Sequence, residues 1–396
     1  MANIPNNTCW LIIVSFVLVF AQEAYDLDFR ATDISMYIGT PTQHVYVYPS
    51  LTTDIIFMIS ANCGELNTLE CPRYCYDPTL SKLYCSAVCQ NLEDFEWCNK
   101  VMYDTRHKFN STNSSTFHFN GNFWRGNLQY YSDQIGQLAR ETMRFKPAVS
   151  ANTISLDLKD WSFVNGMILD SQFVLKENNN NDICRLILNF RGFLGLAPGE
   201  SNLVQLLYEQ NRIPKPVASV VYWQSQIKVG DYNEENCFNW WHTKAEKSKW
   251  MVRLDSLMFF NQTRNANVLM TFDLANSYTY IPDDLFDEIV ESGVIFGRSF
   301  NTYDIRCDVN FNLKLTINNH ELFIPSFRFV TFISVNSCYT SIFPLRESHS
   351  GAQFYVDEPS WILGWALLED YCLAYNYENN EIGFAVSESP FSTAAY

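Results

Sequence analysis

Phe193-Leu194-Gly195-Leu196-Ala197 has a counterpart later in the chain, Ile362-Leu363-Gly364-Trp365-Ala366. In each copy two apolar residues precede a glycine. This pattern predicts a buried strand that another backbone passes closely, because only glycine leaves the room. Each copy also follows, at a distance, a loop-forming segment, at Ser50 in the first half and at Asp273 in the second. The repeated order of loop and apolar-apolar-Gly strand predicts two related halves.

The remaining segments are mainly short runs of β-branched and aromatic residues, which are typical of strands. The predicted strands are Met36–Ile38, Val45–Tyr48, Ile55–Ile59, Phe117–Phe119, Val217–Trp223, Phe311–Ile317 and Phe323–Phe329. Few helices are expected. Ser201 is a candidate cap for one helix, and a second is expected between Pro282 and Gly293. The apolar face of the second helix would consist of Leu285, Phe286, Ile289 and Val290.

From about Asp33 to Ala385 the order of these segments resembles the pepsin-like aspartic proteases. Besides the two repeated stretches, the resemblance rests on Ile38–Gln43, Trp250–Ser256, Thr271–Ser277, Trp361–Gly364 and Asn379–Ala385. It implies an all-β, bilobal fold of two β-sheet lobes that flank a central cleft. The bounds that we expect are a signal peptide at 1–21, an N-terminal lobe at 22–232 with a cysteine-rich insertion at 61–100, and a C-terminal lobe at 233–396.

The family's two catalytic aspartates fall on Ser50 and Asp273. Aspartic proteases are the standard example of two carboxylates too close to ionise together, so that the charged one activates water and the protonated one polarises the scissile carbonyl. A serine hydroxyl is too weak an acid and too poor a base for either role. The sequence therefore predicts a catalytically inactive homologue, not an enzyme. We expect a binding or inhibitory glycoprotein that uses the cleft or its cysteine-rich rim.

The alternative is a residual acid endopeptidase that uses Asp273 with a rearranged carboxylate. Asp54 is the candidate, four residues beyond Ser50. On a strand, an offset of four keeps the same face but moves the side chain about 13 Å along. A solvated or turn-capping role for Asp54 is therefore preferred.

The resemblance also assigns the residues around the two aspartate positions. The threonines that link the family's two loops by hydrogen bonds correspond to Leu51 and Leu274, and the glycines that follow correspond to Thr52 and Ala275. Because a hydroxyl facing a leucine would be unpaired, paired replacement predicts an apolar Leu51–Leu274 contact between the lobes. Independent drift at the two positions is the alternative. Phe119 corresponds to the tyrosine of the family's hairpin over the cleft.

Several features indicate a secreted protein. Trp10–Ala21 is an uncharged apolar run that suits a signal peptide and is too short to span a bilayer, and no other stretch could cross a membrane. Asn110, Asn113 and Asn261 lie in glycosylation acceptor sequences. Twelve cysteines favour an oxidising compartment. We expect an extracellular location, with an endolysosomal one as the alternative.

The eleven cysteines that follow the predicted signal peptide fall into three groups. The resemblance places Cys307 and Cys338 like the family's C-terminal-lobe disulfide. The cluster Cys63, Cys71, Cys75, Cys85, Cys89 and Cys98 could hold zinc, but three disulfides are preferred, and a nested set is one of fifteen connectivities. Cys184, Cys237 and Cys372 remain unassigned.

The composition and the net charge limit the classes of molecule that the chain could bind. With 396 residues, 47% hydrophobic and 16% aromatic residues, the chain can build a large core. Its net charge of −16 argues against nucleic acid and anionic lipid. No motif predicts a cofactor or a metal. We expect a peptide, protein or glycan ligand in the cleft or on its rim.

Overall fold

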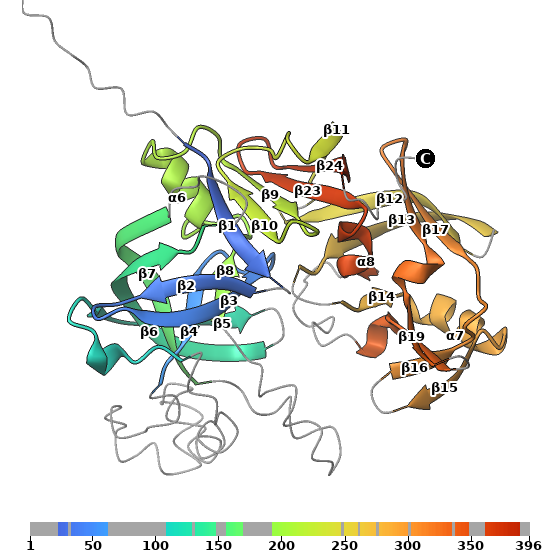
Figure 1. Ribbon diagram of the computed structural model, residues 1–396, viewed down its shortest axis with the longest axis horizontal. Coiled ribbons are helices and arrows are strands. Elements are labelled where there is room, and N and C mark those ends of the chain that lie inside the picture. Colours follow the sequence, from blue (N-terminus) through green and yellow to red (C-terminus); the bar gives the residue numbers. More distant parts are fainter. Residues whose placement is uncertain are drawn as a thin grey trace, which may run out of the picture.

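The computed structural model of the chain describes residues 23–30, 33–61, 108–128, 131–147, 156–168, 192–246, 249–259, 262–274, 277–299, 302–334, 337–347 and 361–388. These residues form mainly β-strands, with three short α-helices among them, in two lobes joined by a connecting sheet (Figure 1). This is the all-β, bilobal fold that the sequence predicts. The predicted signal peptide and nearly all of the predicted insertion lie outside the described residues.

In the N-terminal lobe, the strands that the structure describes follow the order β2-β3-β8-β4-β7-β6-β5. Their bounds are β2 (Asp33–Ile38), β3 (Gln43–Ser50), β4 (Ile56–Ile59), β5 (His118–Leu128), β6 (Tyr131–Phe145), β7 (Leu156–Ile168) and β8 (Gly192–Gly195). β3 alternates the buried Val45 and Val47 with the partly exposed Tyr46 and Tyr48, as expected of a sheet with one face on the core. β2 pairs with β6 as well as with β3, which curls the sheet around that core.

The described C-terminal lobe contains two sheets. The larger follows the order β18-β17-β12-β13-β22-β14-β21, and the smaller follows β15-β16-β20-β19. The bounds in the larger sheet are β12 (Met251–Phe259), β13 (Gln262–Phe272), β14 (Thr279–Ile281), β17 (Asn312–Ile317), β18 (His320–Pro325), β21 (Ile342–Pro344) and β22 (Trp361–Leu363). The bounds in the smaller sheet are β15 (Ile295–Ser299), β16 (Thr302–Ile305), β19 (Val330–Ser334) and β20 (Ser337–Thr340).

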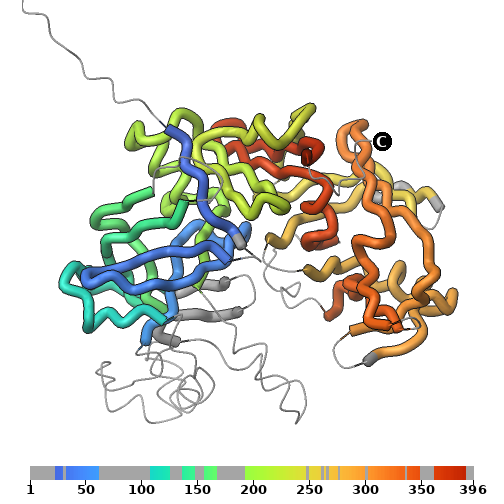
Figure 2. Tube along the Cα trace, viewed as in Figure 1, coloured from blue at the N-terminus to red at the C-terminus, as the bar shows by residue number. Residues whose placement is uncertain are grey.

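The connecting sheet continues the sheet of the N-terminal lobe in the order β11-β24-β23-β9-β10-β1. Its strands are β1 (Tyr25–Arg30), β9 (Val217–Val221), β10 (Gln226–Val229), β11 (Cys237–Lys244), β23 (Tyr371–Asn376) and β24 (Glu381–Ser387). It lies beside both lobes and contains strands from both ends of the described chain, β1 and β24, with β10, β9 and β23 between them (Figure 2). The predicted lobe boundary at 232 therefore falls inside this sheet, because β23 pairs with β9 across it.

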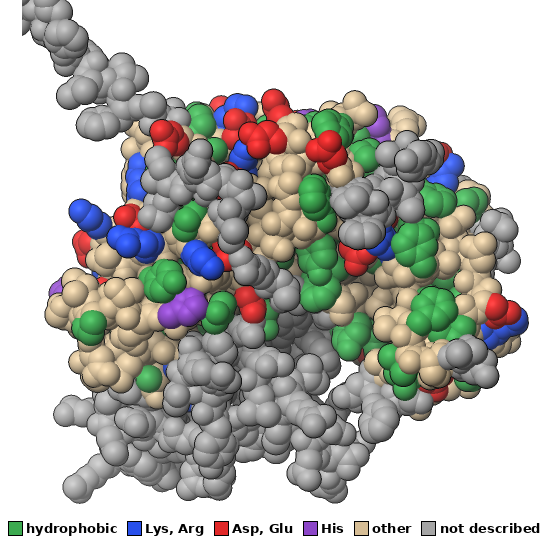
Figure 3. Space-filling model, in the orientation of Figure 1, with side chains coloured by type: hydrophobic (Ala, Val, Ile, Leu, Met, Phe, Trp, Pro, Cys, Tyr) green, Lys and Arg blue, Asp and Glu red, His purple; other side chains and the backbone are tan. Residues whose placement is uncertain are grey.

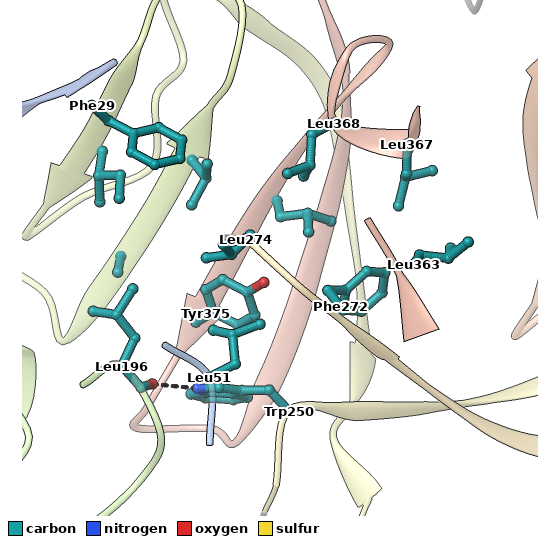
Figure 4. Packing of buried hydrophobic residues seen from close by; sticks show 14 of the residues in the cluster. Phe29, Leu51, Leu196, Trp250, Phe272, Leu274, Leu363, Leu367, Leu368 and Tyr375 are labelled. Atoms are coloured by element: carbon teal, nitrogen blue, oxygen red, sulfur yellow. Dashed lines mark hydrogen bonds between the residues drawn. The ribbon is translucent and has the colours of Figure 1, made fainter. Parts of the chain in front are cut away.

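A continuous hydrophobic core runs through both lobes and the connecting sheet, and Figure 4 shows part of it. At its centre the indole N–H of Trp250 donates to the carbonyl of Leu196, and the hydroxyl of Tyr377 donates to the same carbonyl across 2.8 Å. The Trp250 ring packs against Tyr375 and Tyr377, with centroids 5.1 and 5.0 Å away. These contacts fix Leu196, which follows β8, to Trp250 and Tyr377 of the C-terminal half.

The helices differ from the prediction in detail. Asn202, not Ser201, caps α6 (Leu203–Glu209), because its side-chain oxygen accepts from the N–H groups of Val204 and Gln205. α7 (Asp283–Glu291) follows Pro282 and ends before Gly293, whose φ of +74° suits glycine. Its buried face contains Leu285, Phe286 and Ile289, whereas Val290 is exposed. α8 (Trp365–Leu368) is not predicted from the sequence.

The part of the chain that the structure describes contains two disulfides. One joins Cys307 to Cys338, the pair that the resemblance implies. The other joins Cys237 on β11 to Cys372 on β23, on either side of β24. Cys184 and the cluster between Cys63 and Cys98 lie outside the described residues. Among the described residues, no helix is both long and apolar enough to cross a membrane.

Large hydrophobic side chains are exposed on the C-terminal lobe. Figure 3 shows hydrophobic groups over this lobe and along its junction with the N-terminal lobe. Phe332 and Ile333 on the edge strand β19 are about 64% and 59% exposed. Acidic and basic side chains are interspersed elsewhere on the face that is drawn.

Candidate active site

Ser50 lies at the end of β3, where this strand runs parallel to β8. The last pair of the register is Ser50 with Gly195, and the N–H of Leu196 donates to the Ser50 carbonyl across 2.7 Å. A Cβ on Gly195 would lie only 2.4 Å from the backbone nitrogen of Ile55. This confirms the close backbone approach that the glycine predicts, and it places the fully buried Ser50 against a bare stretch of main chain.

Asp273 occupies the corresponding place in the C-terminal lobe. It follows β13, which runs parallel to β22 with Phe272 opposite Leu363, and its N–H donates to the Leu363 carbonyl across 2.8 Å. The Asp273 side chain is buried, with 2% of the residue exposed. In both lobes, therefore, a strand ends beside the glycine of an apolar-apolar-Gly stretch, and the residue at that end is Ser50 in one lobe and Asp273 in the other.

The hydroxyl of Ser50 is held by its own loop. The N–H of Thr52 donates to Ser50 Oγ across 3.3 Å, and Ser50 Oγ lies 3.1 Å from Thr52 Oγ1. A hydroxyl in this position can accept one hydrogen bond and still donate another. It can orient a water molecule or a carbonyl, but it carries no charge near neutral pH.

An aromatic wall lies on the Ser50 side. Tyr48 stands two residues before Ser50 and so shares its face of the sheet, and its partner across the pairing is Phe193. The Tyr48 and Phe193 ring centroids are 6.2 Å apart. Phe57 packs into the same small cluster and meets Trp124 edge-on, with centroids 5.9 Å apart.

A second aromatic wall lies on the Asp273 side. Ile362 is paired with both Thr271 and Tyr280, and Thr271 shares the face of Asp273 by the same alternation. Phe343 packs against Tyr280, with centroids 6.0 Å apart, and three further members complete the cluster. These are Tyr278, Tyr303 and Leu345.

One phenol in the second wall is hydrogen-bonded to an acid. Tyr303 donates its hydroxyl proton to Glu347 across 2.6 Å. Burial, followed by this hydrogen bond and the Glu347 charge, raises the pKa of Tyr303 to about 12. The phenol therefore stays neutral over the whole range in which a carboxylate site works. Sequence reasoning missed both walls, although the alternation before Ser50 is a signal that could have found Tyr48.

The other residues assigned by the resemblance are placed as follows. Leu51 and Leu274 are buried in one hydrophobic cluster with Trp250 and Tyr375 (Figure 4). Thr52 is partly exposed. Ala275 lies outside the described residues. The predicted direct contact between Leu51 and Leu274 remains a prediction, but both side chains belong to the core that joins the lobes.

Asp54 is engaged away from the site. One of its carboxylate oxygens accepts the N–H of Ser201 across 3.1 Å, and the carboxylate packs against Gly199, where a Cβ would lie 2.2 Å from it. Asp54 thus caps the loop that leads into α6. The rearranged pairing of Asp54 with Asp273 receives no support from this geometry.

Phe119 lies on β5, which pairs antiparallel with β6. Gly121, with φ of +88°, lies at a bulge between Phe119 and Phe123, after which the strand resumes. The position of Phe119 over the cleft remains a prediction. The Phe119 ring packs on Phe123, with centroids 5.4 Å apart.

Two of the three glycosylation acceptors are described. Asn110 is partly exposed, and its side-chain oxygen accepts from both the N–H and the hydroxyl of Thr112. Asn113 is exposed at the end of a short 3-10 helix, Ser111–Asn113. Asn261 lies outside the described residues.

In the described ranges, no group of three or more His, Cys, Asp or Glu side chains is arranged to hold a metal ion.

Comparison with known proteins supports the resemblance. The family model described as "Eukaryotic aspartyl protease" matches residues 88–387. Aspartic protease 6 of Caenorhabditis elegans is 24% identical over 306 residues, which covers 73% of each chain. Aspartic protease 2 of Necator americanus is 21% identical over 381 residues, or 88% of this chain and 81% of that protein. Gastricsin of Macaca fuscata fuscata is 20% identical over 355 residues, or 84% and 85%.

These comparisons correct one prediction. Ser50 in place of an aspartate led us to expect that the chain is not an enzyme. The matching family model describes proteases, and relatives that align over most of the chain are named as proteases, so the expectation of an inactive homologue is overturned. The family model covers about three-quarters of the chain and continues to its last described strand. The chain therefore belongs to the eukaryotic aspartyl protease family.

Proposed function

We propose that the chain binds extended polypeptides between its two lobes and hydrolyses them, with Asp273 as the carboxylate and Ser50 as a hydroxyl partner. The observation that carries this proposal is the equivalent placement of the two residues. Each stands at the end of a strand that runs parallel to an apolar-apolar-Gly strand. Membership of a protease family supplies the reaction class.

The chemistry follows from what each group can do. Ionised Asp273 accepts a proton from a water molecule, whose oxygen forms a bond to the scissile carbonyl carbon. Ser50 donates a hydrogen bond that orients the water or the carbonyl oxygen. The proton held by Asp273 then passes to the leaving nitrogen as the C–N bond breaks. Because a hydroxyl replaces the acid of the usual pair, hydrolysis should be slower by roughly 10² to 10⁴ than with two carboxylates.

The partly exposed members of the two aromatic walls favour a polypeptide over a glycan. Tyr48 lies near Ser50 and Tyr278 belongs to the wall near Asp273, whereas Phe193, Tyr280 and Ile362 are buried. Partly exposed apolar rings near both reacting groups suit large apolar side chains on both sides of the scissile bond. The cysteine-rich rim lies outside the described residues and carries no part of the proposal.

We also propose that the chain folds in the secretory pathway. The Cys237–Cys372 and Cys307–Cys338 disulfides favour an oxidising compartment. The exposure of Asn113 and the partial exposure of Asn110 support the two acceptor sequences as sites of glycosylation.

The test is hydrolysis of a mixture of fluorogenic peptides between pH 3 and pH 8 by the purified mature chain. The matched control is Asp273→Asn, which keeps the size of the side chain and removes its base. We expect slow cleavage between large apolar residues, mapped by mass spectrometry, that the substitution abolishes. Cleavage that persists in Asp273→Asn, or no cleavage by either the natural chain or Ser50→Asp, would contradict the proposal.

A further inference from the structure

Trp365 binds the loop that carries Asp273 at the main chain directly after Asp273. Trp365 is the first residue of α8 and follows Gly364 directly after β22. Its indole N–H donates to the carbonyl of Leu274 across 3.3 Å, while the N–H of Asp273 donates to Leu363 across 2.8 Å. The main chain on both sides of the Asp273 side chain is therefore bound by residues that flank Gly364.

The indole is itself held by residues of the connecting sheet. Tyr222, in the turn between β9 and β10, packs on the Trp365 ring with centroids 5.5 Å apart and a 35° angle between the rings. Phe29 of β1 meets Tyr222 edge-on, with centroids 6.3 Å apart. Burial, with the nearby Glu369 charge adding to it, raises the pKa of Tyr222 to about 12, so its phenol remains neutral across the working range.

We propose that Trp365 is a positioning residue for Asp273: its indole N–H fixes the Leu274 carbonyl, and the ring stack through Tyr222 to Phe29 fixes the indole. The proposal rests on the proposed function, because it gives Asp273 the role of the base. Trp365 itself does not touch the substrate. Its contribution is to keep the Asp273 carboxylate aimed at the attacking water.

The environment makes this hydrogen bond costly to lose. Leu274 is fully buried, so water is not at hand to replace the indole as a donor to its carbonyl. The loop would then relax to pair that carbonyl elsewhere, and the carboxylate of the preceding residue would turn with it. A misplacement of about 1 Å in a reacting group is enough to lower a rate by 10²-fold.

Trp250→Phe provides a matched control for Trp365→Phe. Trp250 also donates its indole N–H to a buried loop carbonyl, that of Leu196, but there the hydroxyl of Tyr377 donates as well. Trp250→Phe therefore removes one of two donors, whereas Trp365→Phe removes the indole bond to Leu274 altogether. Tyr222→Leu removes the ring behind Trp365 and leaves the indole N–H in place.

The experiment compares the four proteins at a temperature where circular dichroism shows all of them folded. For Trp365→Phe we expect kcat on a cleaved peptide to fall about tenfold with KM changed less than twofold. Tyr222→Leu should cause a smaller fall in kcat, and Trp250→Phe should change it less than twofold. A fall in kcat for Trp250→Phe equal to that for Trp365→Phe, or no fall for Trp365→Phe, would overturn the proposal.

A second readout does not depend on hydrolysis. Isotope-edited infrared difference spectra, with Asp273→Asn as the blank, report the protonation of the Asp273 carboxyl. We expect its midpoint to rise in Trp365→Phe, because a buried carboxylate relies on fixed backbone dipoles for its charged form. If no variant cleaves any peptide but this midpoint still rises, the proposed function fails and the positioning role stands. An unchanged midpoint contradicts the positioning role.

Discussion

The N–H of Thr52 donates a hydrogen bond to Oγ of Ser50 across 3.3 Å. The same donor would stabilise a carboxylate at this position, because a backbone N–H two residues on favours the charged form of an acid. The loop around Ser50 thus keeps a feature that suits an ionised side chain, although the side chain itself is neutral.

Ser50→Asp should raise the hydrolytic rate. The new carboxylate would accept the Thr52 N–H and restore the acid that the Ser50 hydroxyl cannot supply. We expect kcat/KM on a cleaved peptide to rise by about 10² to 10⁴. Ser50→Asn is the matched control, with the same size and no acid. Equal rates for the Asp and Asn variants would show that the gain does not come from a second carboxylate.

The natural chain should show a single ionisation in its pH–rate profile. A centre with one carboxylate base is active when Asp273 is charged, so kcat/KM should rise through the pKa of Asp273 and then level off. Ser50→Asp should instead give a bell-shaped profile at acid pH, because one carboxyl must be charged and the other protonated. Peptide hydrolysis from pH 2.5 to pH 8 measures both. A bell-shaped profile for the natural chain would mean that another acid takes part.

Asp26→Asn should stabilise the fold at neutral pH. Asp26 is buried on β1, and one of its carboxylate oxygens has no hydrogen-bond partner. Burial raises the pKa of this carboxyl above 3.8, against the opposing charge of Lys228. The folded state then binds more protons than the unfolded state, so stability falls as the pH rises above 3.8. Removing the charge should raise the free energy of unfolding by roughly 1 kcal/mol at pH 7, with little effect at pH 3.

The control for Asp26 lies two residues further along the same strand. Asp28 is also buried, but its carboxylate is paired with Lys146 across 3.2 Å. Asp28→Asn should therefore lower the free energy of unfolding at pH 7, the opposite sign to Asp26→Asn. Urea unfolding at pH 3 and pH 7 distinguishes the two. The same sign for both substitutions at pH 7 would contradict this account of Asp26.

The Cys237–Cys372 disulfide should contribute more stability than Cys307–Cys338. Its half-cystines are 135 residues apart, against 31 for the other pair. In the chain-entropy model these separations correspond to about 5 and about 4 kcal/mol. Pairwise substitution of each disulfide by serine, followed by calorimetry, should lower Tm more for the longer loop. A larger loss for Cys307–Cys338 would show that packing around the sulfurs outweighs the entropy term.

Local sequence determined the features that depend on near neighbours. The glycine of Phe193–Ala197 predicted a close backbone contact, and the structure shows one at Ile55. Periodicity predicted β3 and β17. Periodicity failed to predict the end of a strand where a proline interrupts a run of strand-forming residues. Phe323–Phe329 ends as a strand at Pro325 and continues as a 3-10 helix, Ser326–Arg328, because a proline provides no N–H to continue the ladder.

Tertiary structure decided the contacts between residues far apart in the chain. Counting cysteines left Cys237 and Cys372 unassigned, and only the strand order β11-β24-β23 brings them together. The same holds for the indole of Trp365 on the Leu274 carbonyl and for Asp54, which binds Ser201 instead of Asp273. Strand periodicity and the missing side chain of a glycine can be read from a few neighbouring residues, whereas the backbone that packs against Gly195, at Ile55, lies far away in the chain. Which loop meets which strand depends on the packing of the whole chain.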